Sequence, residues 1–411
     1  MRDRNAMELR PDMTIGERLR VTRRSINGLT QELLAERSGV NVDTIRKLEQ
    51  NQRQSARIST INSLARALDL DTTALLLGIV SEEGGKNPEI TAIRRALVPA
   101  TDFIPSAETD TEDAPPDVSA LRRSVSDAWT TYHEGDMATL GTVLPQLLAE
   151  ARTAVREHTN GTALRARGVL VKTMQLSAHV LARSGMEDLA LLSLDRAQHV
   201  ARKSNDPLLP AMIANSVSWI FMRTGRLEDS EHVALATADG IEPKLRTSSR
   251  DEIAVYGGLL LSGMSAAARN RRFDTARDLL SVARAAAQRS GEDSSNRWTS
   301  VFGPTAVAMQ AVAVESAAGE WGTALRLAQR IPLTGKVPDS WKAWFLLDVA
   351  YAQAQTYRDS DSVETLRTLR GIAPAWLKRS GLSGVVIREL LARPRRPRGV
   401  VALADFAGVA H

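Results

Sequence analysis

The chain has 411 residues, of which 43% are hydrophobic, and it carries a formal net charge of +5 at pH 7. This length allows more than one globular core, and the mild charge excludes a chain that is basic throughout. Because there is no cysteine, disulfides, thiolate metal sites and thiol redox chemistry are excluded as well.

The chain begins with thirteen residues, MRDRNAMELRPDM, that are charged and lack an apolar segment. We therefore predict a disordered leader over residues 1–13 and no signal peptide. The most apolar window, Ala211 to Met222, is too short to span a bilayer, so we expect a cytoplasmic protein with no membrane partner.

A first helix is predicted after this leader. Thr14 and Glu17 have the spacing of a capping box, in which each side chain bonds to the other residue's backbone N–H. Ile15 and Leu19 then lie on one face of the helix, which predicts an amphipathic element.

Two short helical patterns flank a glycine between Thr30 and Glu49, in the run TQELLAERSGVNVDTIRKLE. Gly39 suits the sharp turn because glycine adopts positive φ freely, and Asn41 is a good N-cap for the second helix. Hydrophobic residues, with a small one at the crossing, lie on the facing sides of the pair: Leu34, Ala35, Val40, Ile45 and Leu48. The outward positions of the second helix are Val42, Asp43, Thr44, Arg46 and Lys47.

Two further helices complete the group. Ser59 is the expected cap of the fourth, and Asp71 is the expected cap of a short fifth helix that Gly78 closes. The inward positions of the fourth are Ile61, Leu64, Ala65 and Leu68. Residues 14–78, with LTQELLAERSGVNVDTIRKLEQNQR and INSLARALDLDTTALLLG, resemble the helix-turn-helix domain shared by phage repressors and the xenobiotic-response-element (XRE) family.

This resemblance implies that the second helix of the pair enters the major groove of double-stranded DNA. Val42, Asp43 and Thr44 would reach base edges, with Lys47 one turn further on and Arg46 on the same outward surface. Lys47 can donate to guanine, Asp43 can accept from cytosine, and Val42 or the Thr44 methyl group can touch a thymine methyl. Asp43 has a competing role, because an acidic residue at a helix start also stabilises the helix dipole.

Phosphate contacts are expected from residues at the edges of the motif. Gln31 begins its helix and can bond phosphate with its amide, and Asn51 and Arg53 follow the reading helix. Residues 14–78 carry ten Lys/Arg against seven Asp/Glu, which is a modest excess for DNA binding. We therefore expect a homodimer on an operator with an inverted repeat.

Residues 79–119 read as a linker with five prolines, Gly84-Gly85 and an acidic excess. Within it, the stretch from Ile90 to Val98 has apolar residues at helical spacing and predicts a short docking helix.

From residue 120 to 392 nearly every segment is an amphipathic helical pattern, and a loose repeat is centred on its turns. A turn residue is followed two positions later by a bulky residue and five positions later by alanine or a similar residue. The turn residues are Gly135, Gly185, Gly225, Arg271 and Gly319. A helix pair cannot bury its apolar face alone, so we expect pairs to stack into an α-solenoid.

This repeat resembles tetratricopeptide (TPR) repeats, with a longer and uneven period. A repressor-type domain followed by such a solenoid resembles regulators abundant in actinobacteria, which implies that the solenoid dimerises or senses a peptide or small-molecule effector. The few aromatic residues near its C-terminal repeats are the candidate effector contacts: Tyr256, Trp298, Phe302, Trp341 and Trp344. The simpler interpretation is that these residues fill the packing between helix pairs.

No enzyme motif is present: there is no GxSxG or GxGxxG, and the six histidines are scattered singly. We therefore predict no catalytic residue, no metal and no cofactor. The predicted protein is all-α, with a lambda-repressor-like five-helix domain at 14–78, a linker at 79–119, a TPR-like solenoid at 120–392 and a basic tail at 393–411. The alternative function is a protein-interaction scaffold, in which the solenoid docks a partner protein and the helix-turn-helix tethers it to DNA.

Overall fold

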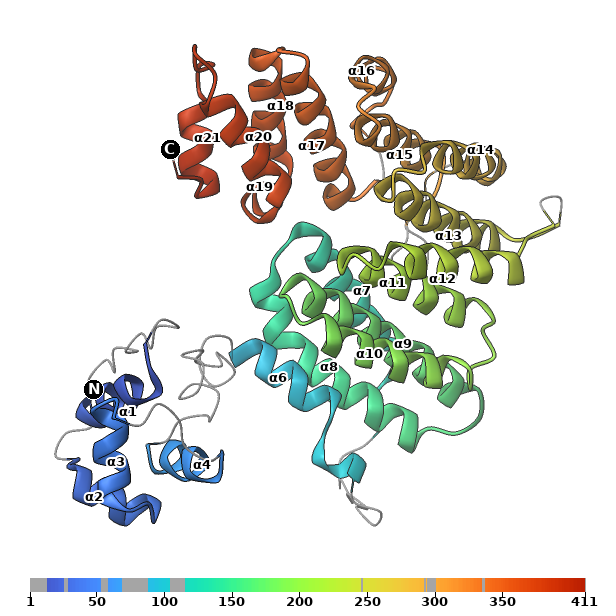
Figure 1. Ribbon diagram of the computed structural model, residues 1–411. Coiled ribbons are helices and arrows are strands. Elements are labelled where there is room, and N and C mark those ends of the chain that lie inside the picture. The colour runs from blue at the N-terminus through green and yellow to red at the C-terminus, as the bar shows by residue number, and fades with distance from the viewer. Residues whose placement is uncertain are drawn as a thin grey trace. The chain divides into compact units, whose positions relative to one another are not determined.

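The computed structural model describes residues 13–25, 29–52, 58–68, 88–103, 115–244, 247–291, 293, 301–334 and 337–410 (Figure 1). All of the elements in these ranges are helices, as the sequence predicts. The chain forms two compact units, residues 1–88 and residues 89–411, and each has its own core. Within these ranges no helix combines the length and the apolar character that a membrane crossing requires.

Four helices are described in the first unit: α1 (Ile15–Ser25), α2 (Gln31–Ser38), α3 (Val42–Glu49) and α4 (Ile58–Ala67). The capping box that opens α1 is confirmed, because the Thr14 N–H donates to Glu17 Oε2 at 2.7 Å and the Glu17 N–H donates to Thr14 Oγ1 at 3.1 Å. The predicted cap of α4 is wrong, because that helix begins at Ile58 and Ser59 lies inside it. The predicted fifth helix, Asp71 to Gly78, lies outside the described residues.

One small core holds these four helices together. Its largest side chains are wholly buried and come from every helix: Leu19, Leu34, Ile45, Leu48, Ile61 and Leu64. Gly16 lets α1 approach the end of α3 closely, because a Cβ at that position would overlap the Leu48 carbonyl oxygen. The predicted inward positions of α1, α2, α3 and α4 are therefore the residues that form the core.

The second unit begins with α6 (Pro88–Leu97), which includes the short helix expected within the linker. Ile93 and Leu97 are wholly buried in the core of this unit. The Leu97 carbonyl accepts hydrogen bonds from Arg152 Nη2 at 2.7 Å and Arg196 Nη1 at 2.6 Å, which satisfies the C-terminal end of the helix. Part of the segment predicted as linker therefore belongs to the second unit.

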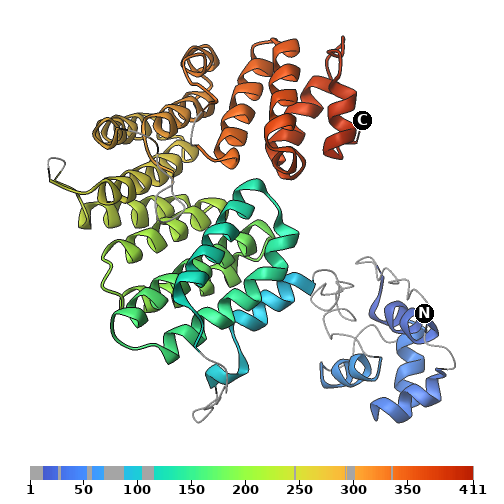
Figure 2. The ribbon, with the colours of Figure 1, turned by 180° about the vertical axis from the view of Figure 1, so that it is seen from behind.

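The remaining helices form consecutive pairs that are joined by short turns (Figures 1 and 2). The paired helices are α7 (Val118–Glu134), α8 (Met137–Glu157), α9 (Asn160–Arg183), α10 (Glu187–Ala201), α11 (Leu208–Arg223), α12 (Leu227–Gly240), α13 (Arg250–Arg269), α14 (Phe273–Ser290), α15 (Pro304–Ala317), α16 (Trp321–Ala328), α17 (Asp339–Gln355) and α18 (Asp359–Ile372). Each odd-numbered helix from α7 to α17 contacts the next odd-numbered helix, so these helices form one layer, and the even-numbered helices pack against it.

The turn inside each pair is made by one residue with positive φ. These residues are Gly135, Gly185, Gly225, Arg271, Gly319 and Tyr357, with φ between 58° and 87°. The residue five positions later is buried in every case: Leu140, Ala190, Ser230, Ala276, Ala324 and Ser362. The repeat pattern therefore located five of the six turns. The sixth, at Tyr357, falls outside that pattern, although the amphipathic helical spacing on either side of it predicts this helix pair as well.

The serines at two of these crossings show why a small polar residue is accepted there. Ser230 Oγ donates to the Ser218 carbonyl oxygen at 2.8 Å, and Ser362 Oγ donates to the Ala350 carbonyl oxygen at 2.8 Å. Each hydroxyl therefore forms a hydrogen bond with the backbone of the facing helix, and the two helices can still approach closely.

Three shorter helices end the chain: α19 (Pro374–Arg379), α20 (Gly381–Leu391) and α21 (Val400–Ala407). We expected a solvated basic tail over residues 393–411, but α21 buries Leu403 and Ala404 in the core. Arg393 is also held, since its Nη2 donates to the Ala354 carbonyl oxygen at 2.6 Å. The hydrophobic residues of the run VVALADFA therefore determine the structure of this segment more than the arginines that precede them.

Helices α17 and α19 contact the C-terminal end of α7. Trp376 Nε1 donates to the His133 carbonyl oxygen at 2.8 Å, and His133 Nδ1 lies 2.8 Å from Ser340 Oγ. The Arg183 guanidinium lies 4.3 Å from the centre of the Trp376 ring and donates through Nε to the Tyr132 hydroxyl at 2.7 Å. The two contacts of His133 join residues more than 200 positions apart in the chain.

Candidate nucleic-acid interface

The turn between α2 and α3 has the geometry that its residues predict. Thr30 caps α2 by accepting the Leu33 N–H at 3.2 Å. Gly39 adopts φ 67°, and its N–H closes the helix on the Ala35 carbonyl oxygen at 2.9 Å. Asn41 is confirmed as the cap of α3, because its Oδ1 accepts the Asp43 N–H at 2.8 Å. Local chemistry alone therefore sets the start of α3.

The two faces of α3 differ sharply. Ile45 and Leu48 are wholly buried against Leu34, as predicted, and Ala35 and Val40 pack against this core while remaining partly exposed. The predicted outward positions divide into two groups on the opposite side: exposed Asp43, Arg46 and Lys47, and half-buried Val42 and Thr44. The solvent-facing surface of α3 therefore carries two cations and one anion.

Asp43 and Lys47 pair with each other along this surface. Lys47 Nζ lies 2.7 Å from Asp43 Oδ2, and both side chains are about half exposed. The hydrogen bond and the positive charge of Lys47 hold the pKa of the Asp43 carboxyl below its ordinary value. The two residues that were expected to read bases thus neutralise each other when no nucleic acid is bound.

Behind the interface lies a buried charged network that we did not predict. Only 2% of the Glu49 side chain is exposed, and its carboxylate accepts hydrogen bonds from Arg23 Nε at 2.7 Å and Arg23 Nη2 at 2.8 Å. Arg23 Nη1 also donates to the Leu29 carbonyl oxygen at 3.0 Å, and the bond to Glu49 raises the pKa of Arg23. The network ties the end of α1 and the start of α2 to the last residue of α3.

A signal for this network was present in the sequence. Glu49 is four positions after Ile45 and adjacent to Leu48, so it belongs to the inward face of α3. A carboxylate on such a face requires a buried donor, and Arg23 on α1 provides it.

The network also changes the expectation for Gln31. Its Nε2 donates to Glu49 Oε2 at 2.7 Å, so this amide positions α2 against α3 in addition to any phosphate contact. Asn51 has a similar structural role: it adopts φ 55° after α3, and its Oδ1 accepts the Thr14 hydroxyl at 2.7 Å. Arg53 lies outside the described residues.

The four helices, the Gly39 turn and the outward polar surface of α3 define a helix-turn-helix domain. Comparison with known families supports this class, since residues 18–75 match a family model described as helix-turn-helix. No curated protein and no solved structure is detectably similar to the chain. The family match therefore assigns a class to the first unit only.

The four candidate effector residues that the structure describes do not form one site. Phe302 is wholly buried, with its ring against Gly257, and Tyr256 is 9% exposed, so both serve the packing of the core. Trp341 is partly buried between the two core clusters, whereas Trp344 is 38% exposed. Trp298 lies outside the described residues.

Proposed function

We propose that this protein is a sequence-specific, DNA-binding transcriptional regulator whose α3 enters the major groove. The observation that carries the proposal is the outward surface of α3, where Asp43, Arg46 and Lys47 project from a helix that a buried core holds rigidly. The helix-turn-helix family match over residues 18–75 supports the same reading. In this class the N-terminal half of the second helix contacts base edges.

The Asp43–Lys47 ion pair suits the recognition of a C·G pair. Lys47 can donate to guanine O6 or N7, and Asp43 can accept from cytosine N4, so opposite charges on the protein meet opposite partners in the groove. A base pair that cannot accept from Lys47 and donate to Asp43 offers nothing in exchange for breaking the ion pair, which favours specificity.

The second unit has a regulatory role in this proposal. Its stacked helix pairs support a tetratricopeptide-like solenoid. We propose that this solenoid holds two copies of the chain as a homodimer, which places two copies of α3 on an inverted repeat. In this proposal the solenoid also responds to a peptide or small-molecule effector. A cytoplasmic location is part of the same proposal. The alternative, a scaffold that docks a partner protein, stays a prediction.

The direct experiment is selection of bound sequences from random duplex DNA by the full-length protein at a defined salt concentration. The selected site then serves in gel shifts with three variants. Lys47→Ala removes a base contact, Arg53→Ala removes a phosphate contact, and Arg66→Ala is the control, because Arg66 is an exposed cation on α4.

Lys47→Ala should weaken binding to the selected site by about 1–3 kcal/mol and blur one base position. Arg53→Ala should weaken all sequences alike and reduce the salt dependence of binding. Arg66→Ala should leave sequence preference unchanged. Selection that returns no enriched sequence, or a Lys47→Ala variant with unchanged preference, would refute the assignment of α3 as the reading helix.

A further inference from the structure

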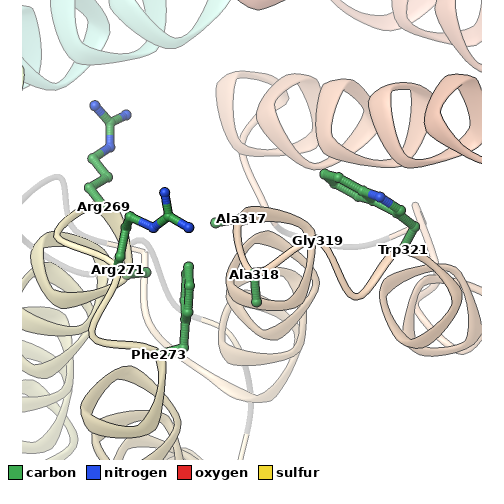
Figure 3. Close-up of a pocket in the computed structure, with 8 residues that line it drawn as sticks. Arg269, Arg271, Phe273, Ala317, Ala318, Gly319 and Trp321 are labelled. Carbon is green, nitrogen blue, oxygen red and sulfur yellow. The ribbon is translucent and has the colours of Figure 1, made fainter.

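A pocket of about 420 Å³ lies between two consecutive turns of the second unit (Figure 3). One wall comes from the α13–α14 turn with Arg269, Arg271 and Phe273, and the other comes from the α15–α16 turn with Gly319 and Trp321. Three alanines complete the lining: Ala268, Ala317 and Ala318. This volume lies in the range of small-molecule sites in proteins.

Two arginine side chains line the pocket. Neither Arg269 nor Arg271 forms an ion pair with any residue that the structure describes, whereas the neighbouring Arg272 pairs with Glu231. In Figure 3 Arg271 reaches over Phe273 toward Ala317, whereas Arg269 extends away from Phe273. Two cations in one recess without a bound acid favour an anionic ligand.

The charge of Arg269 acts on Asp348 of α17. Burial raises the pKa of the Asp348 carboxyl to about 7, and Arg269 opposes that rise. A carboxyl with such a pKa is only partly ionised at neutral pH, so it offsets Arg269 incompletely. Asp274 of α14 and Glu315 of α15 both pair with Arg277.

The backbone at Arg271 is a second observation that points to its side chain. Arg271 adopts φ 60°, a conformation that glycine adopts freely and that a side chain disfavours. Four of the other turns place glycine at this position: Gly135, Gly185, Gly225 and Gly319. The sixth turn also carries a side chain, since Tyr357 adopts φ 58° there, so these turns accept residues other than glycine at a cost in strain. At Arg271 that side chain lines the pocket.

The aromatic walls supply an apolar surface beside the charge. Phe273 and Trp321 are both partly buried, and Trp321 is held edge-on by Tyr351, with ring centres 5.3 Å apart. Both aromatics stand two positions after the turn residue, at corresponding places in consecutive pairs. Their rings can therefore pack against a flat apolar group while the arginines bind an anion.

The pocket also lies where the two hydrophobic cores of the second unit meet. The α13–α14 wall belongs to the core that contains Ala268 and Ala276, and the α15–α16 wall belongs to the core that contains Ala324 and Leu325. A ligand that touches both walls would favour one arrangement of the two cores over others. This is the differential binding that effector control requires.

We propose that this pocket binds a small anionic ligand with an aromatic or apolar moiety, whose carboxylate or phosphate is held by Arg269 and Arg271 and whose apolar part packs on Phe273 and Trp321. The proposal gives a site and a ligand class to the effector sensing proposed above, and in that respect it rests on the proposed function. Its test contains no DNA, so a failure to bind ligand and a failure to bind DNA are separate results.

The test uses isothermal titration calorimetry on the full-length protein with three matched probes. 1-Naphthylacetate carries a carboxylate, 1-naphthyl phosphate carries a phosphate, and 1-naphthylacetamide has the same ring system without a charge. The first two distinguish the two anion sources, and the third measures how much of the binding needs the charge.

Three variants locate the binding. Arg271→Gly removes one cation and installs the residue that the other turns use, so its melting temperature should be no lower than that of the unchanged protein. Arg269→Gln removes the other cation and retains hydrogen-bonding capacity. Arg284→Gln is the control, because Arg284 is an exposed cation on α14 that does not line the pocket.

We expect at least one of the two anions to bind, with the amide about tenfold weaker or more. Arg271→Gly and Arg269→Gln should each weaken anion binding by about tenfold, and Arg284→Gln should change it by less than about twofold. The proposal is overturned if neither anion binds, if the amide binds as well as the anions, or if both pocket variants behave like Arg284→Gln.

Discussion

Replacing Glu49 with alanine should destabilise the DNA-binding unit far more than any change on its outer surface. The Glu49 side chain is 2% exposed and that of Arg23 is 11% exposed, so the ion pair between them is buried. Glu49→Ala deletes both hydrogen bonds between the carboxylate and Arg23, and also the bond from Gln31. The guanidinium then keeps the Leu29 carbonyl as its remaining partner in this network.

The expected cost follows from the unpaired charge. Removing one partner of a buried ion pair costs about 3–5 kcal/mol, because the other charge stays buried without compensation. By contrast, Arg23→Met combined with Glu49→Leu replaces both charges with apolar groups of similar size, which is often neutral in free energy. The double variant should therefore recover most of the stability that Glu49→Ala loses.

Hydrogen exchange on the full-length protein measures this effect within one unit. Amides of α3 that are protected by the Ile45 and Leu48 core should exchange at least about a hundredfold faster in Glu49→Ala, since each 1.4 kcal/mol is a factor of ten. Amides of α9 and α13, in the second unit, serve as the internal control and should not change. Lys47→Ala breaks the exposed pair with Asp43 and should leave exchange unaffected.

Two outcomes would refute the reasoning. If the α3 amides exchange at the same rate in Glu49→Ala as in the unchanged protein, Glu49 does not stabilise the first unit by compensating the charge of Arg23. If the double variant is as unstable as Glu49→Ala, the lost stability comes from packing around Glu49 and not from an unpaired Arg23.

Two further predictions concern the second unit. Gly257→Ala should cost about 1–3 kcal/mol in the free energy of unfolding, because a Cβ there would overlap the Phe302 ring. Stability should also fall as pH drops below about 6.5. Burial, with Arg183 nearby, lowers the pKa of His179 to about 3 and that of His133 to about 4, so protons bind the unfolded chain first. Each histidine then contributes a loss of at most about 1.4 kcal/mol per pH unit, measured by thermal melts between pH 8 and pH 5.

Each of these has a matched control. Adding Phe302→Leu to Gly257→Ala should recover part of the lost stability, whereas no recovery would place the strain elsewhere. His179→Gln should flatten the decline between pH 6.5 and pH 5, and an unchanged slope would contradict a buried neutral histidine. Asp348 acts in the opposite sense, because its pKa is raised and the stability linked to it increases as pH falls, so the variant must be compared with the unchanged protein at each pH.

Local sequence determined the elements of this protein wherever a side chain acts on its own backbone. The Thr14–Glu17 capping box, the Gly39 turn and the Asn41 cap all depend on neighbours within four residues, and the structure has each of them. The same holds for the repeated turns, since the small residue at the crossing must be buried for the pair to close. Where Tyr357 stands in place of glycine, that local signal is absent, and only the helical spacing on either side predicts the pair.

Contacts between distant segments were decided only by tertiary structure. Arg23 meets Glu49 across 26 positions and Trp376 meets His133 across 243, and no periodic pattern specifies either pairing. Charge alone suggested a solvated tail, yet burial of Leu403 turns that segment into a packed helix. Hydrophobic spacing predicts which face of a helix is buried, but it does not predict which other helix packs against that face. The pocket lined by Arg269 and Arg271 exists only because two turns are stacked in the tertiary structure.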